Sequence, residues 1–364
     1  MMSAEQFAIE TPGAGVQQNI FAYLADGQVI NLYTLRNRKG MLVKVTDFGG
    51  IITELHVPDR HGVLADVTLG FADLQPYTGE SAFFGALIGR YGNRIAQGKF
   101  ELDGRPYQLD CNDGANHLHG GRAGFHKVKW DAAPFQKPNS IGLNLRYFSI
   151  DGEQGYPGNL DVTVTYELDD NNQLHVSYHA TTDQATPINL TQHAYFNLAG
   201  QGPVLNHEVM INADRYTPVT AELIPTGVIA PVADTAFDFR QAKPVAVHIA
   251  DEDQQLRFGR GYDHNFVLNQ SSAKEIGLAV RIHEPVSGRV LELWTDEPGL
   301  QFYSGNFLDG SLAGKGQIYE KYSGFCIEPQ HFPDSPNQPD FPSTILWPGE
   351  EYRSNSIYRF SVQT

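Results

Sequence analysis

Strict alternation of apolar and polar residues is the feature that most constrains the fold of this chain. Every second residue is apolar over 160–168, the polar cluster 169–172 is typical of a turn, and the alternation resumes over 174–178. A period of two places one set of side chains on one face of a strand. These segments therefore predict a β-hairpin with one buried face.

The same alternation recurs elsewhere in the chain. Further alternating segments flank turns that contain glycine or lie upstream of the first hairpin: 41–45, 51–57, 143–147, 278–283 and 290–294. Helical periodicity is weak and supports one or two turns near 71–77 and 251–256. The 36 glycines and 21 prolines are spread along the chain and would interrupt long helices. We therefore predict an all-β fold, a large antiparallel β-sandwich of two packed sheets with few short helices.

No internal repeat, low-complexity run or Ser/Gly-rich linker divides the chain. The proline-containing stretch 334–341 resembles a linker in composition, but it lies too near the C-terminus to separate two domains. Because a large β-sandwich can use a chain of this length as one unit, we predict a single domain over residues 1–364.

Net charge and hydropathy argue against two classes of partner. The chain has 26 Lys and Arg against 42 Asp and Glu, so its net charge is −16. Such a surface repels phosphate backbones and anionic lipid headgroups. No run of apolar residues approaches the length of a membrane span. We expect no nucleic acid and no membrane as partners, and a monomer or homodimer.

Two cysteines, Cys111 and Cys326, lie far apart in the sequence. They form neither a disulfide framework nor a CxxC metal motif, so a reduced compartment with both thiols free is expected. Residues 1–15 lack the basic and apolar regions of a secretory signal. These features predict a cytoplasmic protein.

Two glycine-containing clusters hold residues that can contact a ligand. In the segment 89–95, glycines surround Asn93 and Arg94, although the pattern alone favours an ordinary surface turn. No GxGxxG phosphate motif is present there. In the second cluster, His117 and His119 would present both imidazoles on one face of a strand, as in some zinc sites. Further ligands are missing nearby, and the following glycines favour close approach of the backbone to a bound molecule.

Isolated polar residues in apolar surroundings form a third group of candidates. His193 lies among apolar and aromatic neighbours, where a hydrogen-bonded core histidine is the more common outcome. Glu328 follows the apolar run 325–327 and precedes a proline, so its carboxylate is expected to be partly buried and either paired or functional. Asp263 and Gln301 are further polar residues in aromatic segments.

Together these residues suit a neutral polyol or sugar. A histidine and a glutamate can act as acid and base across a small ligand, while Arg, Asp, Asn and Gln side chains can bind hydroxyl groups. The acidic residues near the arginine disfavour a phosphate group. No GxSxG motif is present, so acyl transfer is not supported.

The chain resembles the aldose 1-epimerases, the galactose mutarotases, in motifs that follow the family order over some 300 residues. The matching segments are DFGG at 47–50, GRYGNRI at 89–95, LHGG at 118–121, TQHAYFNL at 191–198, YDHN at 262–265, QFYSGN at 301–306, EPQ at 328–330, and parts of 333–350. The resemblance implies a large antiparallel β-sandwich, anomer interconversion of free aldoses, and catalysis without a metal or other cofactor.

The resemblance also implies a role for each candidate. His193 lies where the family has its general acid and Glu328 where it has its general base. The substrate-binding positions are matched by Asn93, Arg94, His119, Asp263 and Gln301. The family usually has Asn before the catalytic histidine, whereas this chain has Gln192, which is one methylene longer. His117 matches no fixed family position and is left out of the site.

An anomer interconversion needs a charged acid and a charged base at the same pH. Ordinary pKa values near 4.3 for Glu and 6.5 for His give a carboxylate beside an imidazolium around neutral pH only if the histidine is kept charged. Asp263 is the neighbouring acid expected to do this for His193. The resemblance leaves the preferred aldose open among glucose, galactose, xylose and arabinose.

Other functions fit parts of the pattern. A non-catalytic sugar-binding module would use the same sandwich, but it would be expected to lack the acid–base pair. A hexose-6-phosphate epimerase of the same superfamily should show a basic cluster for the phosphate. A glycosidase would use Asp263 and Glu328 as paired carboxylates. Activity on a free aldose, a hexose phosphate and a chromogenic glycoside would separate these functions.

Overall fold

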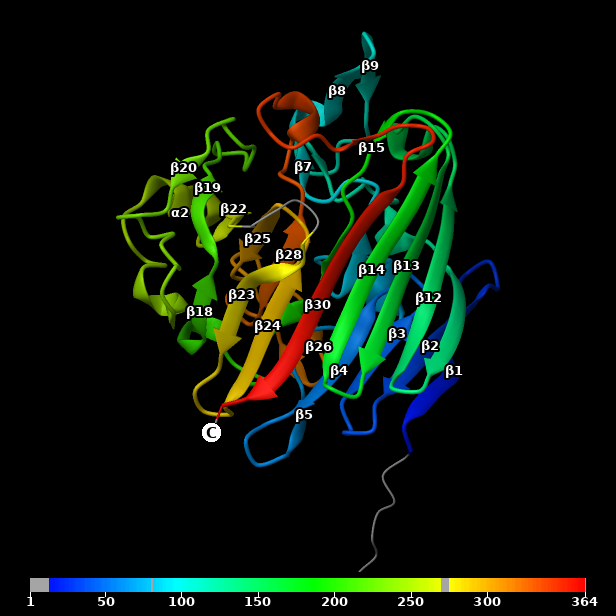
Figure 1. Ribbon diagram of the computed structural model, residues 1–364, viewed down its shortest axis with the longest axis vertical. Helices are drawn as coiled ribbons and strands as arrows, with labels where there is room; N and C mark the ends of the chain where they lie inside the picture. Colours follow the sequence, from blue (N-terminus) through cyan, green and yellow to red (C-terminus); the bar gives the residue numbers. More distant parts are fainter. Residues whose placement is uncertain (1–12, 80, 270–274, 364) are drawn as a thin grey trace, which may run out of the picture.

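A nine-stranded antiparallel sheet forms one layer of the structure, a computed structural model that describes residues 13–79, 81–269 and 275–363. Most of the N-terminal segment considered for an export signal lies outside the described residues. The strands, in spatial order, are β11 (Asp131–Lys137), β12 (Ser140–Ser149), β13 (Leu160–Asp169), β14 (Gln173–Thr182), β30 (Tyr352–Val362), β24 (Arg289–Thr295), β23 (Gly277–His283), β18 (Glu208–Ile211) and β21 (Lys243–Pro244) (Figure 1).

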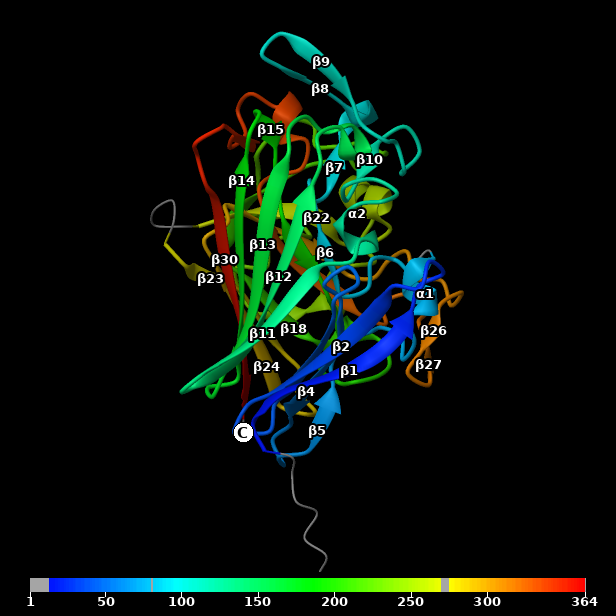
Figure 2. The ribbon, with the colours of Figure 1, turned by 90° about the vertical axis from the view of Figure 1, so that its right-hand side faces the viewer.

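Two further sheets pack against the nine-stranded sheet. One has the strands β1 (Gly15–Tyr23), β2 (Val29–Arg36), β3 (Leu42–Thr46), β4 (Ile52–Pro58) and β5 (Leu64–Asp66). The other has, in spatial order, β17 (Tyr195–Phe196), β28 (Phe325–Gln330), β25 (Gly299–Tyr303), β22 (Asp263–Leu268), β19 (Ala213–Thr217) and β20 (Ala230–Pro231). One buried core cluster joins apolar side chains from all three sheets, and Figure 2 shows the layers from the side.

The remaining strands form small two-stranded sheets. They pair β6 (Ala86–Ile88) with β16 (Thr191–His193), β7 (Arg94–Ile95) with β10 (His117–Leu118), β8 (Lys99–Leu102) with β9 (Arg105–Gln108), β15 (Thr186–Pro187) with β29 (Ile345–Leu346), and β26 (Ala313–Gly314) with β27 (Gln317–Ile318). The predicted all-β sandwich is confirmed. Its second layer, however, is divided among several sheets, because a large twisted sheet splits more readily than it extends.

The alternation that predicted the strands appears directly as alternating burial. Along β13 every second side chain is fully buried and the others are partly exposed. Its partner β14 starts after the turn at 170–172, with Leu168 opposite Leu174. The other predicted hairpins, β3 with β4 and β23 with β24, are also present. Because the two faces of each hairpin differ from one another in polarity, a shift of the strand register by one residue would expose the core side chains.

Helices are short throughout the described residues. The α-helices are α1 (Gln75–Thr78) and α2 (Gln254–Gly259), where helical periodicity was expected, and the second has Asp253 as its N-cap. The 3-10 helices are η1 (Ala96–Gly98), η2 (Phe125–Lys127), η3 (Glu153–Gly155), η4 (Val204–Asn206), η5 (Val245–Val247) and η6 (Ser335–Asn337). None of the described helices has the length and hydropathy needed to cross a membrane.

Two sequence predictions have different outcomes. Cys111 and Cys326 are both free thiols, as expected. The single domain over 1–364 stays a prediction, which is favoured by a core cluster that contains residues from β2 through β30.

Candidate active site

A cavity of about 450 Å³ is lined in part by residues of the six-stranded sheet. Its volume is in the range of pockets that hold small molecules. Every predicted site residue lines it: Asn93, Arg94, His119, His193, Asp263, Gln301 and Glu328. These residues come from separate sheets and loops, so the folded chain assembles the site from segments far apart in the sequence.

Strand pairing explains how the carboxylates and amide of the site come together. Glu328 on β28 lies directly opposite Gln301 on β25, and opposite residues of an antiparallel pair point to the same face. Next to β25, β22 contributes Asp263, whose Oδ1 accepts a hydrogen bond of 2.7 Å from Nε2 of Gln301. The three neighbouring strands therefore present an acidic, hydrogen-bonded floor to the cavity.

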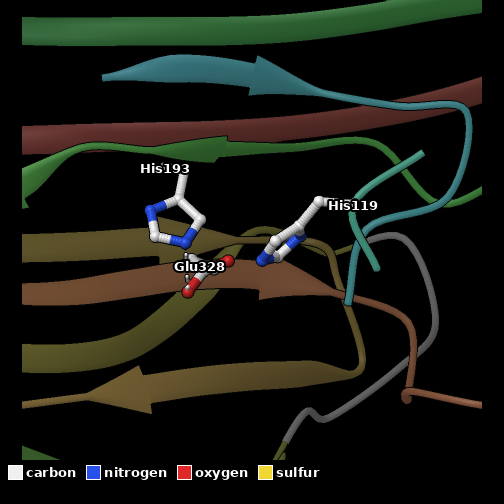
Figure 3. Close-up of side chains that lie close together, drawn as sticks. All are labelled: His119, His193 and Glu328. Carbon is white, nitrogen blue, oxygen red and sulfur yellow. Dashed lines mark ion pairs between the residues drawn. The ribbon is translucent and has the colours of Figure 1, made fainter. Parts of the chain in front are cut away.

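His193 faces this floor from β16. Its Nε2 lies 3.7 Å from Oε1 of Glu328, and both side chains are almost completely buried. Figure 3 shows the His193 imidazole directed at the Glu328 carboxylate, with His119 on the other side of the carboxylate. Oε2 of Glu328 is buried and has no hydrogen-bond partner among the described residues. A buried carboxylate oxygen without a donor is costly, so this atom is the strongest sign of a functional group.

Burial shifts the pKa values of this pair in opposite directions. Burial lowers the pKa of His193 to about 4. Burial and the nearby charge of Asp263 raise the pKa of Glu328 well above its usual range. The expectation that Asp263 keeps His193 charged is therefore wrong, because Asp263 acts on Glu328 instead. Both charged forms are disfavoured, so a neutral imidazole beside a protonated carboxyl is favoured over the ion pair.

His117 and His119 do not share a face, contrary to the expectation for a His-x-His strand. His119 follows β10 with a φ of 51°, which turns its side chain out of the strand direction and into the cavity. His117 points elsewhere, with Nδ1 2.6 Å from the carbonyl oxygen of Asp110 and Nε2 2.5 Å from the hydroxyl of Tyr156. His117 is therefore a buried core histidine outside the site.

The tautomer of His119 follows from one backbone contact. The backbone N–H of Asn93 donates to Nδ1 of His119 over 3.1 Å. Because Nδ1 is the acceptor, the proton of the neutral ring is on Nε2. Burial lowers the pKa of His119, which favours this neutral form. His119 is thus a fixed hydrogen-bond donor.

The same contact bears on metal binding. Ligand atoms of His119, His193 and Glu328 lie within 4.8 Å of one another, close enough for a metal ion to be considered. A ligating His119 would need a free lone pair on Nε2, so its proton would have to be on Nδ1, where the Asn93 N–H already donates. The donor set therefore does not fit a metal ion.

The two arginines of the segment 89–95 have different surroundings. Arg94 lines the cavity, and its Nε donates to Oδ2 of Asp113 over 2.7 Å. Arg90 is buried away from the cavity and donates to the hydroxyl of Ser149 and to backbone carbonyls, including that of Pro157. Asn93 accepts from the backbone N–H of Arg94. Arg90 is thus structural, whereas Arg94 and Asn93 form one wall of the cavity.

Several site neighbours were missed in the sequence. Phe83 packs edge-on against His119 and lies beside His193, with ring centroids 4.7 and 5.8 Å away. Tyr195 stacks on His193 at 5.2 Å. The segment around Phe83 has the composition of a core strand. Phe83 has a φ of 60°, which turns its side chain toward the cavity. No feature of the sequence indicates this backbone angle.

Gln192, the departure from the usual family residue, acts on the backbone near His193. Its Nε2 donates to the carbonyl oxygen of Gly85 over 2.8 Å, and its Oε1 accepts from the N–H of Ala194 over 2.7 Å. Because neighbouring residues of a strand point to opposite faces, this amide does not contact the His193 ring. The longer side chain anchors β16.

Comparisons with known proteins agree with this geometry. The family model of aldose 1-epimerases matches residues 31–359. The chain is 47% identical to galactose mutarotase of Rattus norvegicus, over 95% of this chain and 99% of the relative. It is 42% identical to aldose 1-epimerase of Escherichia coli strain K12, over 94% and 98%. The crystal structure of galactose 1-epimerase from Lactobacillus acidophilus superimposes with a TM-score of 0.85 at 29% identity, over 97% and 100%. The chain therefore belongs to the aldose 1-epimerase family.

Proposed function

We propose that this protein is an aldose 1-epimerase that interconverts the α and β anomers of free aldoses such as galactose and glucose. The observation that carries the proposal is the buried Glu328 carboxylate, which has an oxygen without a donor and faces His193 inside a cavity with polar walls. Family membership supports the same activity, because relatives at 42% identity or more are named galactose mutarotase or aldose 1-epimerase.

Anomer interconversion requires two linked proton transfers. Glu328 takes the proton of the C1 hydroxyl while His193 gives a proton to the ring oxygen O5, so the C1–O5 bond breaks and an open-chain aldehyde forms. Rotation about C1–C2 presents the other face of the carbonyl. Reclosure then reverses both transfers, so no proton is gained or lost. Positioned acids and bases of this kind typically contribute ~10²–10⁴-fold each.

The shifted pKa values favour the opening step. Before opening, the reactive pair is a carboxylate beside an imidazolium, and afterwards both groups are neutral. Burial disfavours the charged forms of both side chains. The neutral pair beside the aldehyde is therefore stabilised relative to the charged pair beside the closed ring.

The cavity walls supply groups for the sugar hydroxyls. Arg94 and the Nε2–H of His119 are donors, whereas Asp263 is an acceptor held in place by Gln301. Charge-assisted hydrogen bonds of this kind contribute ~1.5–3 kcal/mol each. Asn93 completes the wall next to Arg94.

A phosphorylated sugar is a poorer substrate for this cavity. Arg94 is already paired with Asp113, and the other arginine of the lining is Arg260. Acidic residues outnumber them there: Asp113, Glu222, Asp263, Asp309 and Glu328. This balance disfavours a hexose-6-phosphate epimerase. We also propose a cytoplasmic location, because both thiols are free. The net charge of −16 argues against nucleic-acid partners. The proposed enzyme is a monomer or homodimer of one domain.

Polarimetry tests the proposed function directly. Freshly dissolved α-D-galactose or α-D-glucose should reach its equilibrium rotation faster with the protein, in proportion to its concentration. A chromogenic galactoside should release no chromophore, and hexose 6-phosphate anomers should equilibrate at the uncatalysed rate. No acceleration with any free aldose would reject the epimerase, and release of chromophore would favour a glycosidase.

A further inference from the structure

The imidazole of His193 has a partner at each ring nitrogen, and both partners come from the same strand. Nε2 lies 3.7 Å from Oε1 of Glu328. Nδ1 lies 3.5 Å from Sγ of Cys326. Cys326 and Glu328 are two residues apart on β28, and residues i and i+2 of a strand point to the same face. Strand β28 therefore contacts the ring at both nitrogens.

We propose that Cys326 is a positioning residue for His193, whose thiol holds Nδ1 through every protonation state that catalysis needs. This inference rests on the proposed function. A thiol is both a weak donor and a weak acceptor. It accepts from Nδ1–H when the ring is an imidazolium, and it still accepts after Nε2 has given its proton to the sugar, because the neutral ring then keeps its proton on Nδ1. Its weak donor capacity also suits the other neutral tautomer, in which the proton is on Nε2. The ring thus keeps its orientation while Nε2 gains and loses a proton.

His119 shows the contrasting arrangement. Its Nδ1 faces the backbone N–H of Asn93, a group that can only donate. Protonation of that nitrogen would place two hydrogens against each other, so His119 is held in one neutral form. The partners at Nδ1 therefore distinguish the two histidines of the cavity: His193 can exchange a proton with the sugar, and His119 can only donate a hydrogen bond.

A thiol also differs from the partners more common at this position. A carboxylate at Nδ1 would stabilise the imidazolium and oppose proton release to the ring oxygen. The Cys326 side chain is fully buried, and burial raises its pKa well above the usual range, so it stays an uncharged thiol. It orients the imidazole without fixing a charge on it.

The test combines kinetics with a direct view of the ring. Cys326→Ala removes the contact, Cys326→Ser restores a group that donates and accepts, and Cys111→Ala is the matched control at the other cysteine of the chain. We expect kcat for α-D-galactose to fall about threefold to tenfold in Cys326→Ala with a nearly unchanged KM, as for loss of one weak hydrogen bond. Cys326→Ser should recover most of this loss, and Cys111→Ala should match the parent.

Nitrogen-15 NMR of histidine-labelled protein reports the ring itself, with the His193 signals identified from a His193→Asn spectrum. We expect the Nδ1 and Nε2 shifts of His193 to change in Cys326→Ala and to return toward the parent values in Cys326→Ser. Parent-like kcat, pH profile and ring shifts in Cys326→Ala would overturn the inference. If Cys326→Ala does not fold, an altered ring spectrum in Cys326→Ser that leaves kcat unchanged would also overturn it. Failure of the proposed function is distinguishable, because the parent protein itself would then not accelerate mutarotation of any free aldose.

Discussion

Gln301 donates a hydrogen bond from Nε2 to Oδ1 of Asp263, 2.7 Å away on the neighbouring strand. The other end of the same amide, Oε1, accepts from Nε2 of Gln330 over 3.3 Å, and Gln330 also donates to Asn265. The orientation of the Gln301 amide is thereby fixed from both ends. Gln301 thus holds the Asp263 carboxylate toward the cavity as well as lining it.

The first prediction concerns this carboxylate. Asp263→Asn removes the charge and leaves two amides facing each other, so kcat/KM for α-D-galactose should fall about 10–100-fold, as for one or two charge-assisted hydrogen bonds. Polarimetry over a range of galactose concentrations measures this. Asp103→Asn is a suitable control, because Asp103 is exposed and its φ of 53° suits asparagine. Full activity of Asp263→Asn would place sugar binding elsewhere.

The second prediction separates Arg90 from Arg94. Arg90→Met leaves several buried carbonyl groups without a donor, so the free energy of unfolding should fall by at least ~3 kcal/mol. Arg94→Ala should instead lower kcat/KM about 10–100-fold with little change in stability. Urea unfolding and polarimetry on both variants measure the two effects. The opposite pattern would exchange the roles assigned to the two arginines.

Periodicity predicted the strands well because burial of one face depends on local spacing alone. The hairpin of β13 and β14 is an example, since its alternation sets both its strands and its register. Which sheets the strands join depends on long-range packing, so the divided second layer could not be predicted from the same pattern.

The site residues were predictable to different degrees. Glu328 was identifiable from its apolar surroundings, because a carboxylate there requires a partner or a function. The different orientations of His117 and His119 could not be predicted, because they depend on one backbone angle, the φ of 51° at His119. Cys326 shares a face with Glu328 by simple alternation, but its contact with His193 arises only because β17, which directly follows β16 in the chain, pairs with β28.

The third prediction concerns the pH dependence of stability through His264. Burial lowers the pKa of His264 to about 3, and its Nδ1 accepts the backbone N–H of Asp263. The unfolded value is near 6.5, so the unfolded state binds more protons than the folded state between these values. The contribution of a neutral His264 to stability is therefore lost as the pH falls below about 6.5.

His264→Gln removes this titration. Between pH 7 and pH 5 the free energy of unfolding of the parent should fall by about 2 kcal/mol relative to that of His264→Gln. Urea unfolding of both proteins at the two pH values measures this difference. Parallel pH dependences would mean that His264 titrates normally in the folded protein.

The last prediction tests the acid–base pair itself. Glu328→Gln keeps the shape of the side chain but removes the base, so catalysed mutarotation should fall by at least ~10² while galactose still binds. His193→Asn should cause a comparable loss, because the ring oxygen would have to leave as an alkoxide. The two losses should be far from additive in the double variant, since each proton transfer depends on the other. Isothermal titration with galactose separates lost chemistry from lost binding.

The pH profile of the parent adds a second criterion. The pair is active when it holds one proton, so kcat/KM should fall at low pH, when both groups are protonated, and at high pH, when neither is. Because burial lowers the pKa of His193 to about 4 and raises that of Glu328, the low-pH limb should lie near pH 4 and the high-pH limb above the usual range of a carboxyl group. One limb of the bell should be lost in Glu328→Gln. More than about a third of the parent activity with the same profile would exclude Glu328 as the base. Asp263, the neighbouring carboxylate, would then be the group to test in its place.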